Sequence, residues 1–161
     1  MKKELELLKQ AAINEQEGYE FYMMAAQNSD NQESQEALNE LAQEEKQHKE
    51  WILELYEKFE QGSADSFDFD QVTAPSPELF RWENLPLDNT SKALSVFSIG
   101  VKMEYAAVEF YKDAKEKTDD PNVEKLLDIL IDWERQHLND FQKRYDELQK
   151  EWWDEQRFSP S

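Results

Sequence analysis

Cysteine is absent from this chain of 161 residues, and three other residue types are scarce: glycine occurs three times, proline five times and histidine twice. Without cysteine the chain cannot form disulfides, bind iron–sulfur clusters or build zinc knuckles. Long segments that lack glycine and proline and are rich in Ala, Glu, Lys, Leu and Gln favour α-helix. No apolar stretch approaches the roughly 18 uninterrupted residues of a membrane-spanning helix. We therefore expect an all-α protein that does not enter a membrane.

Positive charge is scarce as well, because 18 lysines and arginines stand against 37 acidic residues and give a formal net charge of −19. Nucleic acids and anionic membrane surfaces would repel such a chain, so we expect neither as a partner. Cations suit this charge better. The segment MKKELELLKQAAINEQ at the start has no continuous apolar core, so it is the beginning of a helix and not a signal peptide. We expect a cytoplasmic protein.

Apolar residues recur at helical spacing in four stretches, which predict four long helices in two hairpins. We expect a single domain over residues 1–161 that consists of a helical hairpin at 2–61, a crossover at 62–90, a second helical hairpin at 91–150 and a tail at 151–161 to which the pattern assigns no structure. Two helical hairpins joined by a crossover form a four-helix bundle. In the crossover we expect four aromatic residues to pack on the bundle surface: Phe67, Phe69, Phe80 and Trp82.

The two hairpins are similar in sequence at a constant offset of 89 positions. The motif EFY occurs at 20–22 and again at 109–111, and both histidines follow a glutamate by three positions. The offset relates Glu15 to Glu104, Glu45 to Glu134 and His48 to His137. This repeat indicates the duplication of one helical hairpin.

These six polar residues fall where the helical period calls for apolar core residues. Glu15 and Glu45 are 30 positions apart around the first turn, and Glu104 and Glu134 are 30 positions apart around the second. Residues equidistant from the turn of an antiparallel hairpin lie at the same height. Packing the two hairpins core to core would therefore gather four carboxylates and two imidazoles in one central layer.

A buried layer of four carboxylates needs compensation by cations or by protons. Two divalent cations match the four negative charges, and Glu-x-x-His presents an oxygen and a nitrogen on one helix face. The sequence thus predicts a site for two metal ions, against the alternatives of a purely structural polar layer or a degenerate site. Tyr22 and Tyr111 share the core stripe, either as core residues or as hydrogen-bond donors to ligand carboxylates. We expect the neighbouring acids to face solvent: Glu17, Glu20, Glu44 and Glu109.

The segments NEQEGYEFY, LAQEEKQH, KMEYAAVEFY and LIDWERQH together resemble the di-iron domain of rubrerythrin, in the ferritin-like superfamily, over roughly residues 2 to 150. The resemblance implies a ferritin-like four-helix bundle of up-down-down-up order that forms a homodimer. It implies two iron ions, with manganese or zinc as alternatives. The metal ligands that it implies are the six residues of the central layer: Glu15, Glu45, His48, Glu104, Glu134 and His137.

Two features depart from the family pattern. Rubrerythrins carry a rubredoxin domain with cysteine-ligated iron, and these residues contain no cysteine, so we expect an external electron donor such as a rubredoxin. Rubrerythrins also place a further glutamate three residues after the ligand of the third helix, and Ala107 occupies that position here. Without this carboxylate we expect a more symmetric site, and peroxide reduction is the activity most affected.

The resemblance implies an oxidoreductase of the peroxidase or ferroxidase type, in which the metal ions react with hydrogen peroxide or dioxygen and no catalytic residue is needed beyond the metal ligands. Two alternatives stay open. One is a protein that stores or buffers metal without turnover. The other is a helical interaction module that the metal only stabilises.

Overall fold

The computed structural model describes residues 2–72 and 90–158. Four long helices form this part of the chain: α1 (Lys2–Gln27), α2 (Gln32–Glu60), α3 (Thr90–Lys117) and α4 (Pro121–Phe158). Two short 3-10 helices, η1 (Ala64–Ser66) and η2 (Phe69–Gln71), follow α2. The described residues contain no strand, so the predicted all-α class is confirmed. None of the helices in the described ranges combines the length and the apolarity needed to cross a bilayer.

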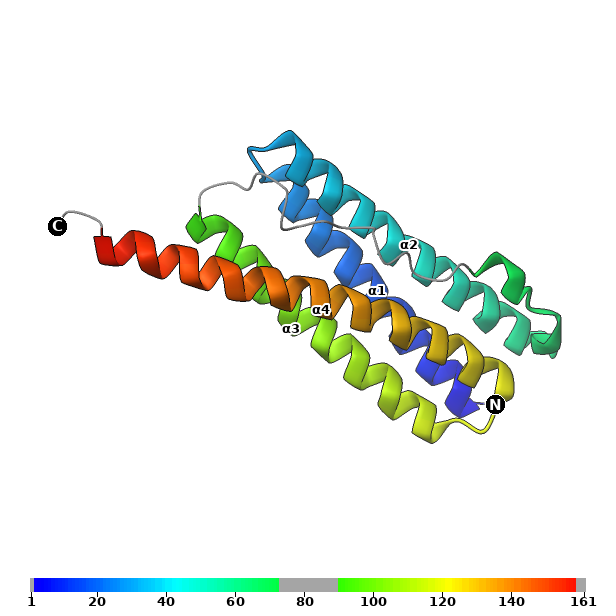
Figure 1. Cartoon of the computed structure of the whole chain (residues 1–161). Helices are drawn as coiled ribbons and strands as arrows, with labels where there is room; N and C mark the ends of the chain where they lie inside the picture. Colours follow the sequence, from blue (N-terminus) through cyan, green and yellow to red (C-terminus); the bar gives the residue numbers. More distant parts are fainter. Residues whose placement is uncertain (1, 73–89, 159–161) are drawn as a thin grey trace.

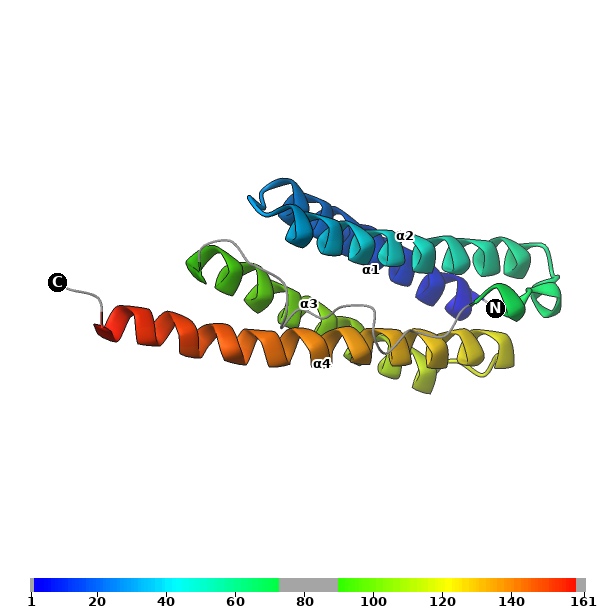
Figure 2. The ribbon, with the colours of Figure 1, turned by 45° about the horizontal axis from the view of Figure 1, so that its top comes forward.

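The helices form two antiparallel hairpins that pack face to face, α1 with α2 and α3 with α4 (Figure 1). Viewed from another side, the hairpins are two layers (Figure 2). α3 begins at the end of the bundle where α1 turns into α2, and α2 finishes at the opposite end (Figure 1). Helices α2 and α3 therefore run in the same direction. This is the up-down-down-up order of a ferritin-like bundle, as the resemblance to rubrerythrin implied.

Side chains near the turns satisfy the backbone N–H groups that open α2 and α4. The side chain of Asn31 accepts a hydrogen bond from the backbone N of Ser34 at 3.1 Å. At the start of α4, Asp120 accepts from the backbone N of Asn122 at 2.9 Å and of Val123 at 3.0 Å, and Pro121 takes the first helical position. These caps fix where each hairpin turns, and so fix the height at which residues of the paired helices meet.

The apolar core consists of two clusters, one toward each end of the bundle. The first cluster includes Leu8 of α1, Leu55 of α2, Ala114 of α3 and Leu127 of α4. The second includes Ala26 of α1, Leu38 of α2, Phe97 of α3 and Phe141 of α4. On every helix, the glutamates and histidines of the predicted layer lie between residues of the two clusters in sequence. The two apolar clusters thus enclose a polar layer at mid-bundle.

One predicted boundary is wrong, because α4 does not end at 150. The helix continues through the first part of the predicted tail to Phe158 and projects past the start of α3 (Figures 1 and 2). Residues 151–157, EWWDEQR, contain no proline or glycine, and Glu, Gln and Arg favour helix. Arg144 forms an ion pair with Glu147 one turn on and another with Glu151, at 2.9 and 3.5 Å. The apolar pattern weakens after 150 because this extension leaves the core, and the helix itself continues.

The start of the predicted crossover packs on the bundle. Phe67 is buried in the first apolar cluster, and Phe69 is partly buried against it. Lys125 of α4 lies over the Phe69 ring at 4.3 Å from the ring centroid. The expected packing of these two aromatics is confirmed. Phe80 and Trp82 lie outside the described residues.

Candidate metal centre

Each of the four helices contributes to the polar layer at mid-bundle. Glu15 comes from α1 and Glu104 from α3, while α2 supplies Glu45 with His48 and α4 supplies Glu134 with His137. All six side chains are buried, with exposed fractions between 0% for His48 and 4% for Glu45. Within α2 and α4 the three-residue spacing places glutamate and histidine on the same helix face. The structure therefore brings together all six residues that the sequence singled out.

The potential ligand atoms form two overlapping sets. Atoms of Glu15, Glu45, His48 and Glu134 lie within 4.8 Å of one another, as do atoms of Glu45, Glu104, Glu134 and His137. Glu45 and Glu134 belong to both sets. The oxygens of Glu134 face different imidazoles: Oε1 is 3.2 Å from Nδ1 of His48, and Oε2 is 3.6 Å from Nδ1 of His137. Two carboxylates are thus placed to be shared, while each set has its own glutamate and histidine.

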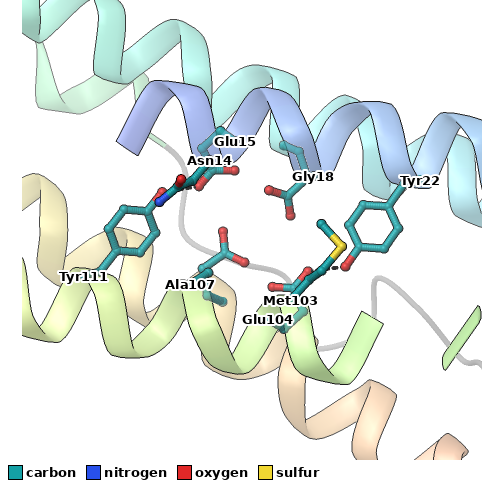
Figure 3. A pocket seen from close by; sticks show the side chains of 10 residues that line it. Asn14, Glu15, Gly18, Tyr22, Met103, Glu104, Ala107 and Tyr111 are labelled. Atoms are coloured by element: carbon teal, nitrogen blue, oxygen red, sulfur yellow. Dashed lines mark hydrogen bonds between the residues drawn. The ribbon is translucent and has the colours of Figure 1, made fainter. Parts of the chain in front are cut away.

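Two tyrosines link the layer across the interface of α1 and α3. The hydroxyl of Tyr22 on α1 donates to Oε1 of Glu104 on α3 at 2.5 Å. Reciprocally, the hydroxyl of Tyr111 on α3 donates to Oε1 of Glu15 on α1 (Figure 3). Each tyrosine donates to a glutamate of the other hairpin, so the two hydrogen bonds are equivalent under the internal repeat. These bonds hold Glu15 and Glu104 in place, as hydrogen-bonding partners of metal ligands do.

The four carboxyl groups of the layer divide into two kinds. Burial raises the pKa of Glu45 and of Glu134 well above the usual range, and the negative charges of the other glutamates raise both further. Burial also acts to raise the pKa of Glu15, but hydrogen bonding with Glu45 and the nearby His48 lower it to about 2. The pKa of Glu104 is lowered in the same manner against its burial, by Glu134 and His137. Without metal, protons are therefore favoured on the two shared carboxyls over the two others.

The imidazoles balance the two charged carboxylates. Burial acts to lower the pKa of His48, but the charge of Glu15 and the close carboxylate of Glu134, 3.2 Å from Nδ1, raise it to about 9. The pKa of His137 rises well above its usual value against burial, because Glu104 and other carboxylates surround it. Raised imidazole pKa values beside lowered carboxyl pKa values favour two imidazolium–carboxylate pairs in the metal-free layer, one with Glu15 and one with Glu104. Protons fill the role that cations would fill in a loaded site.

Several polar atoms of the layer have no hydrogen-bond partner among the described residues. They are Oε2 of Glu15, Oε1 of Glu45, Oε2 of Glu104, both carboxylate oxygens of Glu134 and both ring nitrogens of His48. A buried polar atom without a partner costs about 1–3 kcal/mol. Carboxylate oxygens and imidazole nitrogens are donors that iron, manganese and zinc accept. The donor set and its unsatisfied atoms therefore fit a metal site.

A small cavity of about 30 Å³ opens on the layer between α1 and α3. Its ten lining residues form five pairs related by the offset of 89: Asn14 with Met103, Glu15 with Glu104, Gly18 with Ala107, Tyr22 with Tyr111, and Glu45 with Glu134 (Figure 3). Gly18 and Ala107, the small pair, leave the carboxylates accessible from this side. Since one water needs about 10–15 Å³, the cavity has room for a molecule of two or three heavy atoms.

Glu44 is the functional candidate that the sequence pattern missed. We expected it to face solvent, but its side chain is only 12% exposed and its Oε2 lies 2.7 Å from Nε2 of His137. Glu44 lies beside Glu45 and off the core stripe of α2, so helical periodicity does not indicate its contact with His137 of α4. The internal repeat does contain a signal: the residue 89 positions after Glu44 is Trp133, so the two hairpins differ at this position. This exchange of an acid for tryptophan makes the surroundings of the two histidines differ, as does Trp51 beside His48, whose counterpart 89 residues on is Asp140.

A glutamate from each of two helices and a Glu-x-x-His pair from each of the other two define the class of four-helix bundles that hold metals between carboxylates and histidines. Within that class this chain belongs to the rubrerythrin family, whose family model matches residues 6–145. Neither the curated proteins nor the solved structures contain a significant match to the chain. The family and the buried cluster agree on a metal site at mid-bundle.

Proposed function

We propose that this chain binds two iron ions in the central layer and acts as an oxidoreductase toward hydrogen peroxide or dioxygen. The observation that supports this best is the pair of overlapping ligand sets that share Glu45 and Glu134. A single metal would need only one set. Two divalent ions would carry four positive charges, which equal the charge of the four carboxylates once their protons leave.

The side chains of the layer have distinct tasks in this proposal. Glu15 with His48 would hold one ion, and Glu104 with His137 the other. Glu45 and Glu134, which belong to both sets, would contact both ions. Tyr22 and Tyr111 keep Glu104 and Glu15 oriented by donating a hydrogen bond to each. Iron held by these residues would supply the electrons for reduction of a small oxidant.

The cavity between α1 and α3 limits what can reach the layer. Its volume of about 30 Å³ supports a small oxidant such as dioxygen or hydrogen peroxide over an organic substrate. Gly18 and Ala107 place no carboxylate on this approach, so the glutamates of the layer are the only acids among its described lining residues. The 161 residues also contain no cysteine with which to bind a second redox centre. We therefore propose that electrons come from a separate donor such as a rubredoxin. Homodimer assembly and a cytoplasmic location stay predictions.

Rapid mixing of the Fe²⁺-loaded protein with peroxide, and separately with dioxygen, tests the proposal. We expect an increase in near-ultraviolet absorption as iron is oxidised, and repeated turnover once a reductant is added. Glu134→Ala should abolish the change, while Glu109→Ala, a substitution at an exposed position of α3, should not. Uptake of iron without oxidation by either oxidant would refute the redox function and favour metal storage. Equal stabilisation by zinc with no oxidation would favour a structural metal.

A further inference from the structure

The outer nitrogens of the two histidines have different neighbours. In both rings Nδ1 faces the carboxylates of the layer: that of His48 lies 3.2 Å from Glu134, and that of His137 lies 3.6 Å from the same residue. Nε2 of His137 points outward to the carboxylate of Glu44 at 2.7 Å. Glu44 belongs to α2 and His137 to α4, so this contact also joins the two hairpins.

His48 has an aromatic environment in the corresponding place. The residue 89 positions after Glu44 is Trp133, whose ring meets that of His48 edge-on with centroids 4.9 Å apart. Trp51 lies on another side at 5.6 Å. His48 is fully buried, and its Nε2 has no hydrogen-bond partner among the described residues. The repeat therefore supplies a carboxylate to one imidazole and a tryptophan to the other.

This difference matters when a histidine binds metal through Nδ1. The proton then resides on Nε2, and a carboxylate that accepts this proton fixes the tautomer and the ring orientation and makes Nδ1 a stronger donor. Glu44 is placed to do this for His137. At His48 the N–H would remain buried beside indole rings, and no described residue orients that ring through its far nitrogen.

We propose that Glu44 is a positioning residue that makes the metal position at His137 the tighter of the two, so that the centre fills in order and its two metals are inequivalent. The inference rests on the proposed metal binding, but not on redox activity. It also means that the layer, although built from symmetric ligands, distinguishes its two metal positions by a contact outside the ligand set.

The test measures Co²⁺ affinity at each position separately, in proteins that retain one histidine. His48→Ala retains the His137 position, and His137→Ala retains the His48 position. We expect tighter binding to the first variant. Adding Glu44→Ala should weaken Co²⁺ binding about 10- to 100-fold in the His48→Ala background and leave it unchanged in the His137→Ala background. Glu44→Gln, whose amide oxygen can still accept from Nε2, should recover part of the loss.

Glu40→Ala is the matched control, because it removes an exposed acid one turn earlier on α2. Thermal melting of each metal-free variant shows whether the fold is kept. The proposal is overturned if Glu44→Ala weakens both positions equally, which would indicate a structural role, or weakens neither. Failure of the metal-binding proposal looks different: the unsubstituted protein would then bind no Co²⁺ in the layer at all.

Discussion

The N-terminal hairpin and the C-terminal hairpin present almost the same side chains to the centre of the bundle but different ones at its rim. Facing the cavity, five residues of one hairpin match five of the other, with glutamate, tyrosine and glutamate in the same places. Behind the histidines the match fails, since Glu44 stands behind His137 and Trp133 beside His48.

The comparison separates two kinds of constraint on the layer. Each of the two metal positions needs its own ligands and a tyrosine that orients them, and the internal repeat provides one set in each hairpin. The groups behind the histidines tune each position, so they are free to differ. Symmetric positions should therefore respond equally to equivalent substitutions, and asymmetric positions should not.

The largest effect is expected where the hairpins share a ligand. Glu134→Ala removes a carboxylate common to both ligand sets, so the protein should lose most of both metals, whereas Glu104→Ala should lose about half of the total. Metal content after loading with Fe²⁺ and desalting, measured by elemental analysis, gives the comparison. Glu45→Ala should match Glu134→Ala, and Glu15→Ala should lose the metal beside His48 while it retains the tighter one beside His137. Two metals retained in Glu134→Ala would contradict the shared role.

The next effect concerns pH, and it involves both hairpins. The pKa of His48 rises from an ordinary 6.5 to about 9, so the folded protein keeps a proton that the unfolded chain releases. The resulting stabilisation is complete below pH 6.5 and is lost as pH rises through 9. It amounts to roughly 3 kcal/mol from His48 alone, at about 1.4 kcal/mol per pH unit.

His137, Glu45 and Glu134 also have raised pKa values, so their changes have the same sign, and those of the two glutamates begin at lower pH, above 4.5. Thermal denaturation of the metal-free protein should therefore show a melting temperature that falls between pH 6.5 and 9. With metal bound, the protons are already displaced and this part of the slope should disappear. A metal-free melting temperature that rises over the same range would contradict the assigned protonation.

A smaller and symmetric effect is expected from the tyrosines. Tyr22→Phe and Tyr111→Phe each remove one hydrogen bond to a ligand carboxylate without changing the shape of the core. Each should weaken metal binding by about 10-fold, and the two losses should agree. Calorimetric titration with Mn²⁺ measures both. Tyr105→Phe, at an exposed position on α3, is the control. If only one of the buried tyrosines matters, the hairpins are less equivalent than their contacts indicate.

The smallest effect should come from the small pair at the cavity. A Cβ at Gly18 would lie 3.2 Å from Oε2 of Glu45, while Ala107 already carries a Cβ in the related place. Gly18→Ala should gain helix stability that this close contact offsets, for a net change within about 1 kcal/mol. Ala107→Gly should destabilise by about 1 kcal/mol, because only the helix penalty applies. Urea denaturation of both variants measures the difference, and a loss well above this for Gly18→Ala would show that Glu45 cannot shift.

Much of this arrangement could be predicted from the sequence because it follows helical periodicity. Glu15 and His48 occupy core phase in otherwise apolar stripes, and equal spacing around the turns places them at one height. The reciprocal bonds of Tyr22 and Tyr111 were one of two roles left open, since the period shows that a residue faces the core but not which hairpin it contacts.

The features that were missed depend on contacts that periodicity does not describe. Glu44 lies at the flank of the α2 stripe, where a side chain can face solvent or reach a neighbouring helix, and only the packing of α4 decides between them. The length of α4 was underestimated because apolar spacing marks the buried part of a helix and not its end. Helix propensity over 151–157 was the better guide there.

The most direct test of the central claim is a crystal structure of the protein loaded with Fe²⁺ or Mn²⁺, with metal positions located by anomalous scattering. The account predicts two peaks at mid-bundle, one beside Glu15 and His48 and one beside Glu104 and His137, with Glu45 and Glu134 in contact with both. Six side chains that turn away from one another, or metal bound only elsewhere on the acidic surface, would contradict it.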